Sequence, residues 1–82
     1  MTEYLIMCRS LTHAQRSARL LERRGIIVAV TKAPQGLSSR GCTYALSLKR
    51  KLEEAVRILK KENMLLGKVY ANNNGAYAEV LT

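Results

Sequence analysis

The fold is decided by a continuous apolar run near the N-terminus, Tyr4-Leu5-Ile6-Met7-Cys8. A run of this length without alternation is typical of a strand that is buried on both of its faces. Shortly after it, Thr12 and Gln15 have the spacing of a capping box, in which the Thr12 hydroxyl caps a helix. The sequence therefore predicts a buried strand that leads directly into a helix.

The predicted helix has a narrow apolar stripe and a clear end. Leu11, Ala14, Ala18 and Leu21 recur at helical spacing. Gly25 suits the position just after a helix, where the backbone turns left-handed. Residues 26–30 are short and β-branched, which predicts a buried second strand.

The second half of the chain repeats the pattern. Residues 32–41 are rich in turn formers and predict a loop. The next strand alternates, so that Cys42, Tyr44, Leu46 and Leu48 share one face. We expect a second helix over residues 49–63, a strand over 67–71, an Asn-Asn-Asn-Gly turn over 72–75 and a returning strand over 76–81. The inner stripe of that helix would be formed by Leu52, Ala55, Val56 and Leu59.

This order of elements, β-α-β-β-α-β with one added strand, predicts an α+β fold. It is that of a ferredoxin-like two-layer sandwich, with an extra C-terminal strand in a hairpin. Right-handed crossovers put both helices on one face. The expected strand order is 4-1-3-2, with the extra strand beside strand 4. We expect a single domain over residues 1–82, with a core over 3–71 and a turn and edge strand over 72–82.

Composition narrows the classes of function. The 82 residues include 14 Lys and Arg against 6 Glu, with no Asp, and the formal charge is +8. This balance favours nucleic acid, phosphate or an acidic protein as a partner. Two Cys and one His cannot complete a four-ligand zinc site, so we expect no metal and no cofactor. The N-terminus lacks a basic segment and a long apolar stretch, which predicts a cytoplasmic protein with reduced thiols and no membrane segment.

The predicted fold brings the two cysteines to one end of the sheet. Cys8 ends the first strand and Cys42 begins the third, which lies antiparallel beside it. Arg9 and the loop before Cys42 would lie at the same end. Whether the two sulfurs share a face stays open, because the first strand is apolar on both faces.

Cys42 follows the segment Ser38-Ser39-Arg40-Gly41, which offers a guanidinium and unhindered backbone N–H groups. Nearby cations lower the pKa of a thiol and make it a better nucleophile. Cys42 is therefore the candidate reactive thiol, and Cys8 is a candidate resolving thiol. The alternative is that either residue is a small buried side chain, as unpaired Cys commonly is.

Hydrolytic chemistry has little support. His13 could act as a base near the thiol, although a His in the first turn of a helix is more often exposed. The chain has no Asp to orient it, and Glu3, Glu22 and Glu79 lie far from Cys42 in the predicted fold.

Two other classes of function stay open. One is a basic interaction module that binds RNA or an acidic protein through Arg16, Arg23, Lys49 and Lys51. RNA is the weaker choice, because Tyr44 is predicted on the core face instead of on a base-stacking surface. The other is a structural domain whose exposed sheet face or edge forms a homodimer.

Three segments together resemble a small bacterial family, the selenium/sulfur carrier protein-like family. They are Cys8-Arg9-Ser10-Leu11-Thr12-His13-Ala14-Gln15-Arg16, Leu21-Glu22-Arg23-Arg24-Gly25-Ile26 and Leu37-Ser38-Ser39-Arg40-Gly41-Cys42-Thr43-Tyr44-Ala45-Leu46. The resemblance covers roughly residues 3 to 80, and the cysteine of the family pattern maps onto Cys42. Many members have Gly where this chain has Thr43. The resemblance implies a carrier or accessory protein, not a stand-alone enzyme. Such a carrier holds a persulfide or selenide on Cys42 and exchanges it with donor and acceptor proteins.

Overall fold

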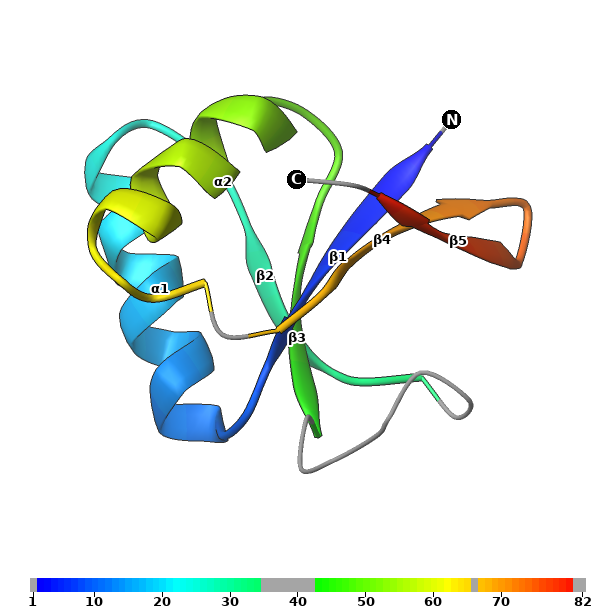
Figure 1. Cartoon of the computed structure of the whole chain (residues 1–82), viewed down its shortest axis with the longest axis horizontal. Helices are drawn as coiled ribbons and strands as arrows, with labels where there is room; N and C mark the ends of the chain where they lie inside the picture. The colour runs from blue at the N-terminus through cyan, green and yellow to red at the C-terminus, as the bar shows by residue number, and fades with distance from the viewer. Residues whose placement is uncertain (1, 35–42, 66, 81–82) are drawn as a thin grey trace.

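The computed structural model describes residues 2–34, 43–65 and 67–80. Its layers are a five-stranded antiparallel sheet and two helices that lie together on one side of it (Figure 1). The predicted α+β class is confirmed. The elements are, in order, β1 (Glu3–Cys8), α1 (Leu11–Arg23), β2 (Ala29–Lys32), β3 (Tyr44–Leu48), α2 (Leu52–Lys61), β4 (Val69–Asn73) and β5 (Ala76–Val80).

The strands lie in the order β2-β3-β1-β4-β5 across the sheet. β1 is central and is antiparallel to both of its neighbours. It pairs with β3 so that Tyr4 lies opposite Leu48 and Cys8 lies opposite Tyr44, and it pairs with β4 on its other side. This central position accounts for the unbroken apolar run in β1, because a strand between two others presents both of its faces to packed side chains.

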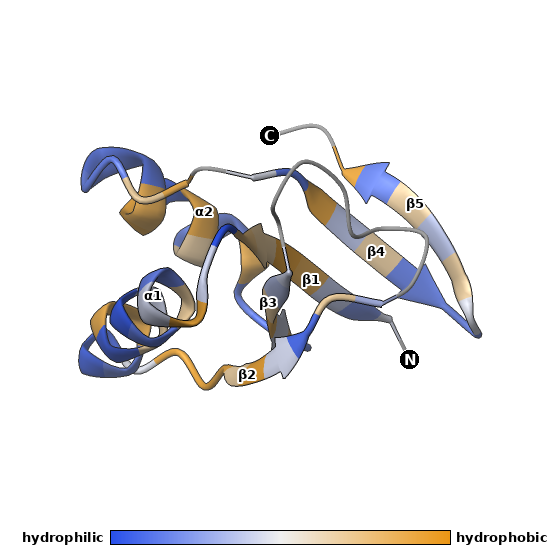
Figure 2. Cartoon of the chain, turned by 90° about the horizontal axis from the view of Figure 1, so that it is seen from below, coloured by the Kyte–Doolittle hydropathy of each residue, from blue (hydrophilic) through white to orange (hydrophobic). Residues whose placement is uncertain are grey.

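Apolar side chains are buried on both faces of the sheet. On the helix side, Ile6, Cys8 and Leu46 join side chains of α1 and α2 in the larger core. Figure 2, coloured by hydropathy, shows the helices on one side of the sheet. On the opposite face, a smaller cluster is formed by Leu5, Met7 and Ala45, with Ala33 and Tyr70 against it.

The N-cap of α1 differs from the prediction. Ser10, not Thr12, caps the helix: its backbone is extended, and its Oγ accepts a hydrogen bond from the His13 N–H at 3.1 Å. The Ala14 N–H donates to the Ser10 carbonyl, so Thr12 lies inside the first helical turn and not before it. Ser and Thr can both cap a helix, so local spacing alone does not distinguish Ser10 from Thr12.

The C-terminal end of α1 follows the prediction. Gly25 has a φ of +80°. Its N–H donates to the Glu22 carbonyl, and the Ile26 N–H donates to the Leu21 carbonyl, which together form a Schellman motif. Ile26 and Leu21 are both buried, so they supply the apolar contact that accompanies this motif.

The prediction of a buried second strand over residues 26–30 is wrong. β2 covers Ala29–Lys32, and all four of its residues are exposed. Ile26 is buried in the Schellman motif that follows α1, while Ile27 is 89% exposed. The reason is position: β2 is at the edge of the sheet and pairs only with β3. β-Branched composition indicates a strand but not its place in the sheet.

α2 begins later than predicted. Lys51 precedes it with a left-handed backbone, φ 61°, and makes no side-chain capping bond. Lys49 and Arg50 therefore lie directly before the helix, and Lys51 is its N-cap, at the positive end of the helix dipole. The first turn holds Glu53 and Glu54, whose charges suit a helix N-terminus. The predicted inner stripe is confirmed, since Ala55, Val56 and Leu59 are buried and Leu52 packs against them.

The predicted hairpin is confirmed between β4 and β5. Asn74 and Gly75 have φ values of 52° and 91°, as the two central positions of a type I′ turn require. The Gly75 N–H also donates to Asn72 Oδ1 at 2.9 Å. The turn fixes the register in which Asn73 lies opposite Ala76.

Candidate functional site

The chain segments that precede and follow residues 35–42 lie side by side. The Ala33 N–H donates a hydrogen bond to the Thr43 carbonyl at 2.9 Å, directly after β2 and directly before β3. Thr43 is exposed and is bonded to Cys42. The predicted carrier thiol and four of its five predicted supporting residues lie outside the described residues: Ser38, Ser39, Arg40, Gly41 and Cys42.

Cys8 ends β1 inside the protein. Its side chain is 0% exposed and belongs to the helix-side core. Its Sγ donates to the Ile6 carbonyl at 3.5 Å. Tyr44, its partner in the register, packs against the same core. Cys8 is thus at the predicted end of the sheet, but its sulfur is not accessible to another protein in this structure.

Arg9 and Lys32 are described cations at this end of the sheet, and Lys32 is exposed and lies opposite Tyr44 at the end of β2. Arg9 is exposed and lies between the end of β1 and the N-cap of α1. Since Cys8 lies opposite Tyr44, Arg9 follows β1 at the end where Thr43 precedes β3. The fold therefore places Arg9, which carries a guanidinium group, at the same end of the sheet as Thr43, the residue that follows Cys42 in the sequence.

His13 differs from the expectation of an exposed side chain. It is partly buried, and its Nε2 lies 2.7 Å from the Met64 carbonyl, to which it donates. The Nδ1 atom is buried without a hydrogen-bond partner among the described residues. His13 therefore joins the start of α1 to the segment that follows α2. No local pattern could have shown this, because the two residues are distant in sequence and meet only in the tertiary structure.

We expect His13→Ala to lower the free energy of unfolding by about 1–3 kcal/mol, because the part-buried Met64 carbonyl would lose its donor. Urea unfolding followed by circular dichroism measures the change. Ser17→Ala is the matched control on the same helix. Its buried hydroxyl has no partner within the described part of the chain, so its removal should be neutral or stabilising. Equal destabilisation by both variants would contradict the role assigned to the His13 hydrogen bond.

Two features of other site classes are absent from the described residues. No group of three or more His, Cys, Asp or Glu side chains in residues 2–34, 43–65 and 67–80 is arranged to hold a metal ion. Neither α1 nor α2, the helices of the described part, has the length and apolar character needed to span a bilayer.

The described structure is a small α+β protein with a buried core cysteine at the end of β1, and Ala33 is hydrogen-bonded to Thr43, which follows Cys42 in the sequence. A family model described as "Putative Se/S carrier protein-like" matches residues 3–71, and the chain belongs to this family. The match includes Cys8, Arg9 and Cys42. Comparison with curated proteins and with solved structures gave no match.

Proposed function

We propose that this protein is a sulfur or selenium carrier that holds a persulfide or selenide group on Cys42. Family membership supports the class of function. The burial of Cys8 is the observation that supports Cys42 as the carrier thiol. The chain has two cysteines, and exchange requires a sulfur that a partner can reach. Because Cys8 is 0% exposed, the carrier role falls to Cys42.

The proposed transfer needs no oxidant and no metal. The Cys42 thiolate attacks the terminal sulfur of a donor persulfide, R–S–SH. An S–S bond forms to Cys42 as the donor S–S bond breaks, and the donor leaves as the thiolate R–S⁻. The same steps with R–S–SeH place selenium on Cys42. An acceptor thiolate then takes the terminal atom in the same way and restores the Cys42 thiolate.

The surroundings proposed for Cys42 favour its thiolate. Arg9 is exposed at the end of β1, and Arg40 is close in sequence. Both would stabilise a negative sulfur, while Gly41 and the hydroxyls of Ser38 and Ser39 would offer hydrogen bonds. Cys8 could resolve the adduct as a disulfide only after its sulfur had left the core. The donor and acceptor are proposed to be proteins that meet this protein in the cytoplasm.

We further assign the arrangement of β1 to β4 with α1 and α2 to the ferredoxin-like class. The antiparallel neighbours β2-β3-β1-β4 and the two helices on one face support this assignment. In that arrangement β5 is an addition beside β4, formed by the hairpin at Asn74 and Gly75.

Persulfide loading tests the function directly. The reduced protein is incubated with a low-molecular-weight persulfide, alkylated, and digested for peptide mass spectrometry. We expect the wild type and Cys8→Ser to gain one sulfur atom on the peptide that contains Cys42, and Cys42→Ser to gain none. A gain that persists in Cys42→Ser, or no gain in the wild type, would contradict the proposal.

A further inference from the structure

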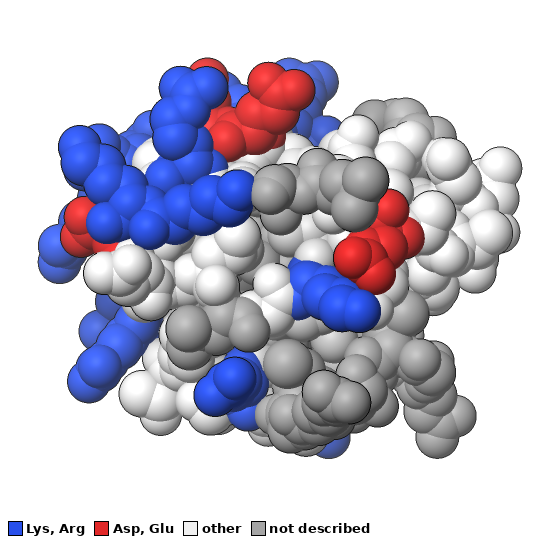
Figure 3. Space-filling view, in the orientation of Figure 1, with Lys and Arg blue, Asp and Glu red and all other residues white. Residues whose placement is uncertain are grey.

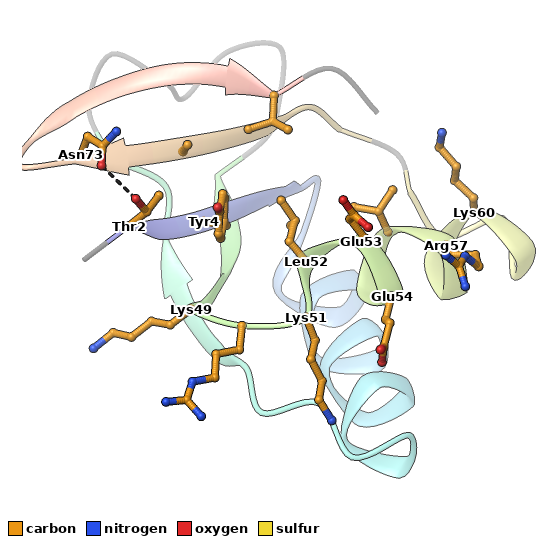
Figure 4. Close-up of a pocket in the computed structure, with 14 residues that line it drawn as sticks. Thr2, Tyr4, Lys49, Lys51, Leu52, Glu53, Glu54, Arg57, Lys60 and Asn73 are labelled. Atoms are coloured by element: carbon orange, nitrogen blue, oxygen red, sulfur yellow. Dashed lines mark hydrogen bonds between the residues drawn. The ribbon is translucent and has the colours of Figure 1, made fainter.

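A groove lies at the end of the sheet away from Cys8 and Thr43. It has a volume of ≈ 1010 Å³ and runs between α2, the turn from Lys49 to Lys51, and strands β1, β4 and β5 (Figure 4). Tyr4, which lines it, lies opposite Leu48 at the far end of the β1–β3 ladder from Cys8 and Tyr44. At about 3.3 Å per residue, β1 alone separates the two ends by roughly 15 Å. The groove is therefore distinct from the proposed carrier site.

The groove combines an apolar lining with a cationic rim. Tyr4, Leu52 and Val56 line it and also belong to the helix-side core or pack against it. The consecutive cations Lys49, Arg50 and Lys51 line it where the chain enters α2, and all three are exposed. Figure 4 shows Lys49 and Lys51 extending away from the sheet.

The rim cations are not neutralised by acidic side chains of the same chain. Within the described ranges, Lys49, Arg50, Lys51 and Arg57 make no ion pair within 4.0 Å, whereas Lys68 pairs with Glu79 elsewhere at 3.4 Å. The sequence spacing of Glu53 and Arg57 predicts an i,i+4 pair, and it does not form at that distance. Figure 3 shows further Lys and Arg side chains gathered over the helical side of the molecule. The rim cations are therefore available to form ion pairs with an external partner.

The charge and the lining of the groove indicate which class of molecule binds there. A second copy of the chain would bring +8 against +8, which opposes association. A nucleic acid would find one aromatic side chain, Tyr4, among the described lining residues on which a base could stack. An acidic polypeptide can place an apolar side chain against the lining and its carboxylates on the rim.

We propose that this groove is a docking site for an acidic protein segment that carries apolar anchor residues. The apolar lining supplies the buried contact area, and the turn from Lys49 to Lys51 supplies steering and orientation through opposite charge. Docking here would leave the end of the sheet at Thr43 uncovered, because the groove and Thr43 lie at opposite ends of the β1–β3 ladder. The proposal is independent of the chemistry of Cys42.

Fluorescence anisotropy with a labelled peptide of alternating Glu and Leu tests the proposal. The comparison probes are a peptide with Ser in place of Leu and a labelled oligouridylate of equal length. The variant Lys49→Glu/Arg50→Glu changes the rim. Arg19→Glu/Arg24→Glu is the matched control, because it changes the same charge at exposed positions in α1 and directly after it, outside the groove.

We expect the Glu-Leu peptide to bind most tightly and its Kd to rise about tenfold or more in the rim variant, with less than about a threefold rise in the control. Circular dichroism confirms that each variant is folded. If the rim variant is unfolded, Lys49→Ala/Arg50→Ala replaces it. Absence of binding, equal weakening by both variants, equal binding of the Ser peptide, or tighter binding of oligouridylate would each overturn the proposal. Persulfide loading of Cys42 in the rim variant, measured separately, should be unchanged.

Discussion

In the folded protein, Cys8 is expected to react with iodoacetamide about a thousandfold more slowly than in the urea-unfolded chain. Its side chain is 0% exposed inside the helix-side core, so the reagent reaches the sulfur only when the core opens. For a domain with at least about 4–5 kcal/mol of stability, global opening is rarer than one molecule in a thousand. The rate is measured by quenched alkylation and mass spectrometry in Cys42→Ser, where Cys8 is the sole cysteine.

A native alkylation rate within about tenfold of the unfolded rate would contradict this expectation, because it would require an opening costing less than about 1.4 kcal/mol. Cys8 would then be exposed by a local fluctuation, and it could reach a persulfide on Cys42 during exchange. Slow labelling would instead confine persulfide chemistry to Cys42. The same measurement therefore distinguishes a one-cysteine carrier from a carrier with a resolving thiol.

Gly67→Ala is expected to lower the free energy of unfolding by about 3 kcal/mol, as strong overpacking does. A Cβ at this position would lie 2.6 Å from the Met7 carbonyl oxygen, 2.9 Å from its Cβ and 3.0 Å from its carbonyl carbon. Two of these atoms are backbone atoms of β1, which is held between β3 and β4. The Met7 N–H also donates to the Lys68 carbonyl at 2.9 Å, so the two segments cannot separate without losing that bond. Urea unfolding measures the change.

Gly25→Ala is the matched control for Gly67→Ala. Gly25 has a φ of +80°, and no atom lies within 4 Å of a Cβ built on it. Its substitution therefore costs only the left-handed backbone penalty of about 1–2 kcal/mol. If Gly67→Ala proves less destabilising than Gly25→Ala, the close approach of residue 67 to β1 is not a constraint on the fold.

Gly67 also illustrates a structural constraint that local sequence patterns do not predict. By sequence it is an ordinary small residue at the start of a predicted strand, and β4 in fact begins at Val69. Its requirement for Gly arises from Met7, which is distant in sequence. The contact between His13 and Met64 has the same origin, and so does the groove, which joins residues of β1 to residues of α2.

Features that depend on neighbours along the chain could be predicted from the amino-acid sequence. The stop at Gly25, the turn at Asn74 and Gly75, the inner stripe of α2 and the buried run of β1 each follow from backbone preference or apolar spacing over a few residues. The other features arise from contacts between segments that are distant in the sequence. They place Cys8 on the helix side of the sheet and β2 at an exposed edge, and they leave the cations before α2 beside an open groove. Burial and charge pairing depend on which segments meet across the sheet, and those contacts join residues too far apart in the chain for local spacing to specify.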